Sequence, residues 1–583
     1  MPALDFDLDA RQTADCRLRL TVEFDRSIAA GESHVEFFLP AWTPGSYLIR
    51  EYARHVDRVA AVDAGTGSPL RCDKVRKNRW RIELPTEVAR IRLAWSVYAH
   101  ELTVRTADAT AAHAYWNHAC VLLWPVDRPE LDASLEVRMP DGWRGDSALP
   151  SIAPTRGGDA AWAIADLDHA IDSPCLLGRA ARLEFTALGI PHTVLLDGLD
   201  GIAPAPGFAA DLTAILEAAA EVFDGALPYE RYTFFCLFAD EGYGGLEHQS
   251  SCTLLAKRTA FAKPASYREF LALCAHELFH AWNVKRLRPR ELWSFDYENE
   301  NYTRMLWLAE GWTAYYDDLL CLRAGRFTAE QYLEVVAKNV RRVLGNPGRL
   351  RLSLSDSSFD AWIRLYRPDE NTRNSSQNYY VNGAVAAMCL DLTIRRHSDG
   401  RHCLDDVLRE LWATTFEQGR GYELEDVLGA IERVADRAAR ELFAAMTQGT
   451  FEPPVAELLT AFGITCRIDT GKEPQLGVMF AADSMRLASV TADSPAAAAG
   501  LQPGDELVAV QGLRTTSALW QDVFRAVAKN DEPLELLVAR RGVMLTLTAR
   551  PLPSAPEVEL AIERDADGER AALRAGWLRR RES

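Results

Sequence analysis

The chain has 583 residues, a formal net charge of −18, 48% apolar residues and 25% charged residues. This length predicts three or four domains of ordinary globular composition. The acidic balance argues against nucleic acid and against an anionic membrane as partners, because either would require a basic surface that releases counterions.

The N-terminus and the cysteines indicate a protein of a reducing compartment. Residues 1–12 carry acids where a signal peptide would have a basic region and an apolar core, and no later run reaches the ~20 apolar residues of a membrane span. The eleven cysteines are scattered and form no CxxC pair, which indicates reduced structural cysteine. We therefore expect a soluble, cytoplasmic protein, unless a leader precedes this sequence.

Alternation of apolar and polar residues over 18–24 and again over 91–97 predicts antiparallel strands with one solvated face, and DAGTGSP at 63–69 is typical of a turn. We expect an antiparallel β-sandwich-like domain over residues 1–185. Within it, residues 40–56 (PAWTPGSYLIREYARHV) combine a Pro-Gly turn with aromatic residues. Taken alone, this stretch indicates a structural corner and not a site.

A catalytic domain is expected over residues 186–460. Helical spacing over 208–223 and a short apolar run over 232–239 predict a helix and a buried strand. The glycine-rich bend DEGYGGLEHQSS (240–251) follows. Its Gly244 and Gly245 would let the backbone approach an extended peptide, and Glu247 could receive a cationic amine. Without further context, a plain loop is the simpler interpretation.

The run His276-Glu277-Leu278-Phe279-His280 is the strongest chemical signal. Histidines four positions apart lie on one helical face and can share a metal ion, with Glu277 beside it. Such a pattern arises by chance in on the order of one chain of this composition in a hundred. A capping-box pattern at 266–269, after Pro264, predicts the start of the helix, and Pro289 bounds it on the far side.

A catalytic zinc requires three protein ligands and one open position. The best third candidate is Glu310, in a helical stretch over 305–325 that ends near Gly325. Gly311 beside it would let this helix approach the histidine helix closely. Asp317 could orient a ligand histidine, although a salt-bridged surface acid is the simpler explanation.

The remaining sequence predicts a helical C-terminal half of the catalytic domain, followed by a small β-rich domain. Helical apolar spacing covers 384–397 and 404–447, and Pro453-Pro454 marks its end. The segment 465–553, with QLGVMF at 475–480 and SPAAAAGLQPGDELVAVQG at 494–512, resembles a PDZ domain. Residues 554–583 form a C-terminal tail with a short helix expected over 568–581.

HELFHAWNVKR followed by WLAEGWTAYY, with GGLEH upstream and WTPGSYLIREYARH in the first domain, closely resembles the glycyl aminopeptidase family of gluzincin metallopeptidases. The resemblance implies an N-terminal β-domain, a thermolysin-like α+β catalytic domain with a mostly helical C-terminal half, and a PDZ domain. It makes the 40–56 corner a family feature, though not a catalytic one.

The resemblance also implies the roles of individual residues. His276, His280 and Glu310 would bind one Zn²⁺ per chain, and Glu277 would be the general base. GGLEH stands where related aminopeptidases carry a Gly-x-Met-Glu-Asn motif, so Glu247 would anchor the α-amine of the substrate.

A tyrosine that stabilises the tetrahedral intermediate is expected from the same superfamily, in a Tyr-x-Lys-Gly motif. Tyr380 and Gly383 match its tyrosine and glycine, whereas Asn382 replaces the lysine. Because of this departure, Tyr379 remains an alternative donor.

The sequence therefore predicts a zinc aminopeptidase that acts on peptides with a free N-terminus, with a preference for small residues such as Gly and Ala. A zinc endopeptidase guided by the PDZ domain is a second hypothesis. An inactive peptidase-like scaffold is a third. A peptide C-terminus is a candidate ligand of the PDZ domain, and no nucleic-acid or membrane partner is expected.

Overall fold

A computed structural model describes residues 2–450, 452–554 and 556–579. The chain divides into two compact units, Met1–Asn301 and Tyr302–Ser583, and the boundary falls inside the expected catalytic domain. Among the described helices, none combines the length and the apolar character needed to cross a lipid bilayer. All eleven cysteines are free thiols.

The N-terminal domain is built from three β-sheets. The largest has the strand order β14-β15-β12-β1-β2-β8-β4-β5, and the smaller ones have the orders β13-β16-β10-β9 and β11-β3-β7-β6. The strands are β1 (Leu4–Asp9), β2 (Arg17–Asp25), β3 (His34–Phe38), β4 (Val56–Asp63), β5 (Pro69–Leu70), β6 (Cys72–Arg76), β7 (Arg79–Glu83), β8 (Arg90–Tyr98), β9 (Ala107–Ala109), β10 (His113–Trp116), β11 (Trp124–Pro125), β12 (Ala133–Arg138), β13 (Arg144–Ser147), β14 (Ser151–Ile152), β15 (Ala160–Ile164) and β16 (Cys175–Gly178).

The alternation seen in the sequence fixes the large sheet. In β2 every second residue is buried, and β2 pairs antiparallel with β8 so that Leu20 lies opposite Trp95. The strands predicted over 18–24 and 91–97 are confirmed. One pairing departs from the expected antiparallel sandwich, since β1 and β12 run parallel. Parallel strands need a long connection, which the intervening sheets supply here.

A fourth sheet, which is mixed, begins at residue 181 and carries part of the candidate site. Its order is β17-β18-β19-β21-β20, with β18, β19 and β21 parallel and both outer strands antiparallel to their neighbours. The strands are β17 (Ala181–Ala187), β18 (Ile190–Asp197), β19 (Tyr232–Ala239), β20 (Gly244–Glu247) and β21 (Ser251–Lys257). The strand predicted over 232–239 is confirmed.

Two helices pack with this sheet, α2 (Phe208–Val222) and α3 (Pro264–Phe279). The helix predicted over 208–223 is confirmed. The capping box predicted for α3 is wrong: Pro264 occupies the first turn, so the helix begins ahead of Ser266, and Lys263 is its N-cap. The helix also ends at Phe279, well before Pro289.

The second unit begins with a helical half that confirms the spacing over 384–397 and 404–447. Its longest helix is α9, which spans 19 residues. The helices are α4 (Leu306–Ala309), α5 (Gly311–Arg323), α6 (Ala329–Leu344), α7 (Leu354–Phe359), α8 (Thr372–Ser375), α9 (Tyr379–His397), α10 (Leu404–Thr414), α11 (Leu424–Val434), α12 (Arg437–Gln448) and α13 (Val455–Ala461).

The close approach that Gly311 permits is to α9, contrary to the prediction that it faces the histidine helix. A Cβ added at Gly311 would lie 2.6 Å from the Cα of Gly383 and 2.7 Å from the carbonyl oxygen of Tyr379. The two glycines therefore let α5 and α9 pack backbone against backbone, which fixes the start of α9 beside Glu310.

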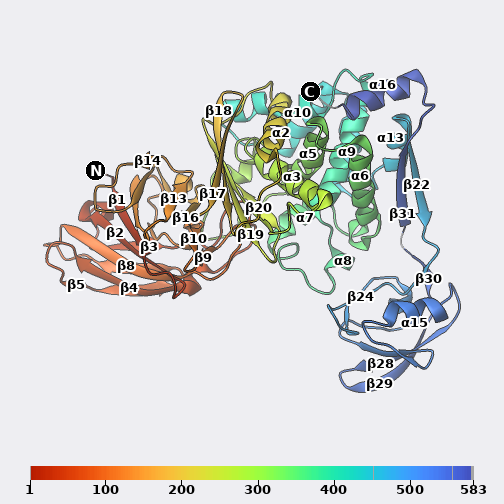
Figure 1. Ribbon diagram of the computed structural model, residues 1–583, viewed down its shortest axis with the longest axis horizontal. Helices are drawn as coiled ribbons and strands as arrows, with labels where there is room; N and C mark the ends of the chain where they lie inside the picture. Colours follow the sequence, from red (N-terminus) through yellow and green to blue (C-terminus); the bar gives the residue numbers. More distant parts are fainter. Residues whose placement is uncertain (1, 451, 555, 580–583) are drawn as a thin grey trace. The chain divides into compact units, whose positions relative to one another are not determined.

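The PDZ-like domain is carried on a two-stranded ribbon formed by β22 (Ile464–Thr470) and β31 (Pro556–Ile562), which run side by side (Figure 1). Its own elements are β23 (Pro474–Gln475), β24 (Val478–Phe480), β25 (Leu487–Val490), α14 (Pro495–Ala498), β26 (Glu506–Val510), β27 (Leu513–Arg514), α15 (Trp520–Val527), β28 (Leu534–Arg540), β29 (Val543–Ala549) and β30 (Leu552–Pro553).

The tail folds back onto the helical half. Helix α16 (Gly568–Trp577) covers most of the span predicted for a short helix, of which positions 580 and 581 lie outside the described residues. Trp577 is fully buried, and its indole N–H donates to the hydroxyl of Tyr315 at 3.0 Å. The C-terminal segment is thus an integral part of the second unit.

Candidate functional site

The two histidines lie at the C-terminal end of α3. His276 is in the last turn and half-buried, whereas His280 is the C-cap and 1% exposed. Their ring centroids are 4.7 Å apart with an interplanar angle of 84°. The pair therefore meets as the four-residue spacing predicts, although the second histidine stands where the helix ends.

The orientation of His280 is fixed by its own turn. Its Nδ1 lies 2.7 Å from the carbonyl oxygen of Asn283. A carbonyl oxygen only accepts, so Nδ1 carries a proton, and in the neutral ring Nε2 is then the atom available as a ligand. Val284 follows with a φ of 147°, a strained value for a β-branched residue. The residues present therefore fit a metal ion, since one ring is already held in its ligating tautomer.

Strand β20 lies against the Glu277 side chain. The structure corrects the plain-loop interpretation of the glycine-rich bend, because Gly244–Glu247 form the outermost strand of the five-stranded sheet within the described chain. A Cβ added at Gly245 would lie 2.1 Å from the Cδ and Oε1 of Glu277. Gly245 therefore provides the space that the Glu277 carboxylate occupies, and its carbonyl accepts from Arg105 at 3.2 Å.

Glu247 is brought next to Glu277. One donor atom from each of Glu247, Glu277 and His280 lies within 4.8 Å of the others. The Glu247 side chain is 4% exposed, and no lysine or arginine of the described residues forms an ion pair with its carboxylate. A buried carboxylate without a fixed cation favours a cationic ligand.

The aromatic corner of the N-terminal domain also reaches Glu247. A Cβ added at Gly45 would lie 2.4 Å from Oε2 and 2.6 Å from Oε1 of Glu247. Gly45 has a φ of +84°, so both the turn and the space require glycine here. The sequence indicated a structural corner in this stretch. The structure adds that the corner forms one wall around the Glu247 carboxylate.

Two further candidate residues, Glu310 and Tyr380, belong to the second unit. Glu310 is 2% exposed and lies between α4 and α5, where its φ and ψ of −100° and −44° interrupt the single helix predicted over 305–325. Asp317, the candidate partner of a ligand histidine, is half-buried on α5.

Tyr380 is the second residue of α9 and keeps its proton. The Asn378 side chain accepts the backbone N–H of Tyr380 at 2.8 Å. Burial, followed by the Glu310 carboxylate, raises the pKa of Tyr380 well above its usual value. Tyr379 stacks on it at 5.0 Å but is 0% exposed, whereas Tyr380 is half-buried. Tyr380 is therefore the better placed of the two to meet a ligand.

Sequence reasoning missed a buried ion cluster that ties together the segments after Glu247 and after His280. Asp172 accepts the Gln249 N–H at 2.8 Å, and its carboxylate lies 2.5 Å from the Lys285 ammonium and 3.5 Å from His248 Nδ1. Although burial opposes it, the Lys285 charge and His248 hold the pKa of Asp172 well below its usual value. Lys285 follows the HELFH run closely, but no sequence signal identifies Asp172, which lies 113 positions earlier in the chain.

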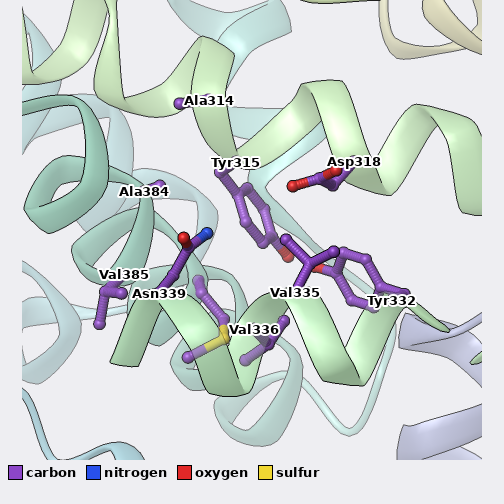
Figure 2. Close-up of a pocket in the computed structure, with 10 residues that line it drawn as sticks. Ala314, Tyr315, Asp318, Tyr332, Val335, Val336, Asn339, Ala384 and Val385 are labelled. Carbon is purple, nitrogen blue, oxygen red and sulfur yellow. The ribbon is translucent and has the colours of Figure 1, made fainter. Parts of the chain in front are cut away.

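A small cavity between α5, α6 and α9 is unsuited to a substrate. Figure 2 shows Tyr315, Asp318, Tyr332 and Asn339 around it, and its volume is about 20 Å³. Such a volume holds a single water molecule. The hydroxyl of Tyr315 meanwhile donates to Asp391 at 2.7 Å. The cavity is therefore part of the packing around α5.

Comparisons with known proteins match three parts of the chain. Residues 269–386 match the M61 glycyl aminopeptidase model, residues 5–179 the Peptidase M61 N-terminal domain, and residues 486–540 a PDZ domain. The two M61 models together span half of the chain. The match over 269–386 includes the HELFH run, Glu310 and Tyr380.

Among solved structures, an aminopeptidase N family protein from Idiomarina loihiensis shares 26% identity with a TM-score of 0.90, covering 99% of this chain and 100% of that one. An M1 zinc metallopeptidase from Deinococcus radiodurans shares 16% identity with a TM-score of 0.48, covering 78% of this chain and 94% of that one. A Mesorhizobium japonicum protein named "Putative zinc metalloprotease" is 42% identical over 66 residues, which are 11% of this chain and 17% of the relative.

Proposed function

The chain belongs to the M61 glycyl aminopeptidase family of zinc metallopeptidases, and we propose that it is an aminopeptidase that removes residues from the free N-terminus of peptides. The observation that carries this proposal is Glu247. Its buried carboxylate lies beside the base Glu277, at the outermost strand of a sheet, and has no lysine or arginine ion pair among the described residues. The protonated α-amine of a peptide would provide the missing cation.

We propose His276, His280 and Glu310 as the ligands of one zinc ion per chain. Two imidazole nitrogens and a carboxylate oxygen are the donor set of several catalytic zinc sites, and the HELFH run with Glu310 offers these residue types. When bound, zinc supplies a Lewis acid that polarises a carbonyl and acidifies water. The Asn283 carbonyl would keep the Nε2 atom of His280 available for it.

Glu277 would move the proton. Its carboxylate would accept a proton from the attacking water and later deliver it to the leaving amine. The position of the carboxylate depends on Gly245, because any side chain there would occupy the same space. Glu277 is 4% exposed, so it meets little bulk water that would compete for this proton.

Tyr380 would stabilise the oxyanion that develops on the scissile carbonyl. Its hydroxyl is protonated and can donate, and such donors contribute roughly 3–4 kcal/mol to the transition state in other enzymes. The half-buried position of Tyr380 supports this residue over the fully buried Tyr379.

The substrate would bind as an extended chain along β20. The carbonyl of Gly245 and the open edge of this strand are the groups that an extended backbone can meet, with Gly244 and Gly245 leaving room for it. The Gly45 turn would close the amine end of the site beside Glu247. We propose a preference for small N-terminal residues, Gly and Ala, on the basis of the family name.

The PDZ domain would take the C-terminal carboxylate of a peptide at Gln475–Val478. Gly477 there has a φ of +78°, and a Cβ at this position would meet the Cβ of Ser494 at 2.4 Å, so the loop is tightly constrained. Asn374 holds the domain to the helical half, because its side chain donates to the Val490 carbonyl at 2.9 Å and accepts the Ala492 N–H at 2.7 Å.

The test is a matched pair of substrates, glycine p-nitroanilide and its N-acetylated form, measured with and without 1,10-phenanthroline. We expect hydrolysis of the free-amine substrate only, and its loss with the chelator. Cleavage of the blocked substrate at a similar rate would favour the endopeptidase, and the absence of stoichiometric zinc would favour the inactive scaffold.

A further inference from the structure

The hydroxyl of Tyr380 has a second tyrosine as its neighbour. The hydroxyl oxygens of Tyr366 and Tyr380 lie 3.2 Å apart, and either atom can be the donor. Tyr366 is 14 positions earlier in the chain and belongs to no helix or strand, and no motif in the sequence singles it out.

The segment that carries Tyr366 is held firmly. The Tyr366 N–H donates to the carbonyl of Ala361, which is fully buried, at 3.2 Å. Arg364 joins the two ends of the segment, since its Nε donates to Asp360 at 2.9 Å and its Nη1 to the Ser375 carbonyl at 3.3 Å. Tyr366 is therefore fixed as a neighbour of Tyr380 by the fold around it.

The direction of this hydrogen bond determines what Tyr380 can do. A tyrosine hydroxyl has one proton and can also accept. If Tyr380 donates to Tyr366, its proton is engaged in that hydrogen bond. If Tyr366 donates, Tyr380 does not use its proton on Tyr366, and the accepted hydrogen bond makes Tyr380 a stronger donor.

We propose that Tyr366 is a positioning residue that donates to Tyr380 and so directs the Tyr380 proton toward the developing oxyanion. This inference rests on the proposed function, in which Tyr380 is the oxyanion donor. Tyr366 itself does not touch the reacting atoms. Its effect reaches the reaction only through Tyr380, and it acts in the transition state more than in substrate binding.

A double-mutant cycle tests this role. The proteins are the parent, Tyr366→Phe, Tyr380→Phe and the double variant, assayed for kcat and KM on glycine p-nitroanilide. Each substitution keeps the ring and removes only a hydroxyl. Tyr366→Phe should lower kcat about tenfold, as expected for one hydrogen bond, with KM unchanged. Tyr380→Phe should lower kcat by about 10²–10³-fold, and the double variant should equal Tyr380→Phe.

Tyr98→Phe is the matched control. Tyr98 is 41% exposed on β8 of the N-terminal domain, and its loss of a hydroxyl should change neither constant. A parent-like kcat for Tyr366→Phe would overturn the inference. Equal losses from Tyr366→Phe in the presence and in the absence of the Tyr380 hydroxyl would also overturn it, because the residue would then act independently.

The outcomes separate this inference from the proposed function. If the parent cleaves only the N-acetylated substrate, the aminopeptidase assignment fails. The kcat values of the double-mutant cycle are then measured with that substrate and test the role of Tyr366 in the same way. If the parent cleaves the free-amine substrate and the cycle is additive, only the role of Tyr366 fails. If the parent cleaves neither substrate, both are overturned.

Discussion

Substituting alanine at Gly245 is expected to displace the carboxylate of Glu277, the proposed base, without changing Glu277 itself. The added Cβ would lie 2.1 Å from the Cδ of Glu277, where ordinary contact begins at 3.4 Å, so the carboxylate must move by about 1.3 Å. The backbone of Gly245 is not in the left-handed region, so alanine introduces no strain of its own. Misplacement of a catalytic group by about 1 Å costs on the order of 10²-fold in rate.

We therefore expect Gly245→Ala to lower kcat for glycine p-nitroanilide about 100-fold. The added Cβ clashes only with the side chain of Glu277. The loss of unfolding free energy should therefore stay within the ~1–3 kcal/mol typical of overpacking. Zinc content and the thermal unfolding midpoint are measured on the same samples. Gly568→Ala is the matched control, because a Cβ there meets nothing within 4 Å and the backbone is unstrained.

A parent-like kcat for Gly245→Ala would refute the reasoning, since Glu277 would then either tolerate the displacement or not be the base. Loss of zinc together with activity would show instead that the whole site is disrupted. Neither result is expected from a clash confined to the Glu277 side chain.

Three further outcomes are expected. Glu247→Gln should lower kcat/KM for glycine p-nitroanilide by about 10²-fold while zinc content stays at the parent level, because the amine loses its charged partner; an unchanged kcat/KM would rule out the amine anchor. Lys285→Met should lower the unfolding free energy in denaturant by about 3 kcal/mol, because Asp172 keeps a buried charge, and adding Asp172→Asn should restore part of it. The third prediction concerns His113. Although burial opposes it, the Asp108 and Asp197 carboxylates raise the pKa of His113 to about 9, above the 6.5 of the unfolded chain. The contribution of His113 to the stability of the fold is therefore fully present below pH 6.5 and is lost as the pH rises through about 9. At 1.36 kcal/mol per pH unit this is about 3 kcal/mol, and His113→Gln should flatten the decline in stability between pH 6.5 and 9.

Local periodicity predicted the elements that lie within one stretch of chain. The alternation over 18–24 and 91–97 and the apolar run at 232–239 became β2, β8 and β19, because burial of one face sets the period of a strand. The HELFH spacing likewise brought His276 and His280 together. The start of α3 was misplaced because Pro264 at the first turn outweighed the capping residues.

Contacts between distant segments could not be predicted from spacing. The close approach of the Gly45 turn to the Glu247 carboxylate brings together positions 202 residues apart in the sequence. The Asp172–Lys285 ion pair brings together positions 113 residues apart. Neither leaves a periodic signal, because each depends on how separate sheets and helices pack. The edge-strand character of Gly244–Glu247 was missed for the same reason, since pairing with β21 and not composition makes that bend a strand.

The central claim is that Glu277 moves the proton at a zinc centre held by other side chains. The most direct measurement is the zinc content and the turnover of Glu277→Gln, which preserves the size of the side chain and removes its ability to accept a proton. The account predicts one zinc per chain, as in the parent, with kcat for glycine p-nitroanilide lower by about 10²–10⁴-fold. Turnover close to that of the parent, in a variant that keeps its zinc, would contradict it.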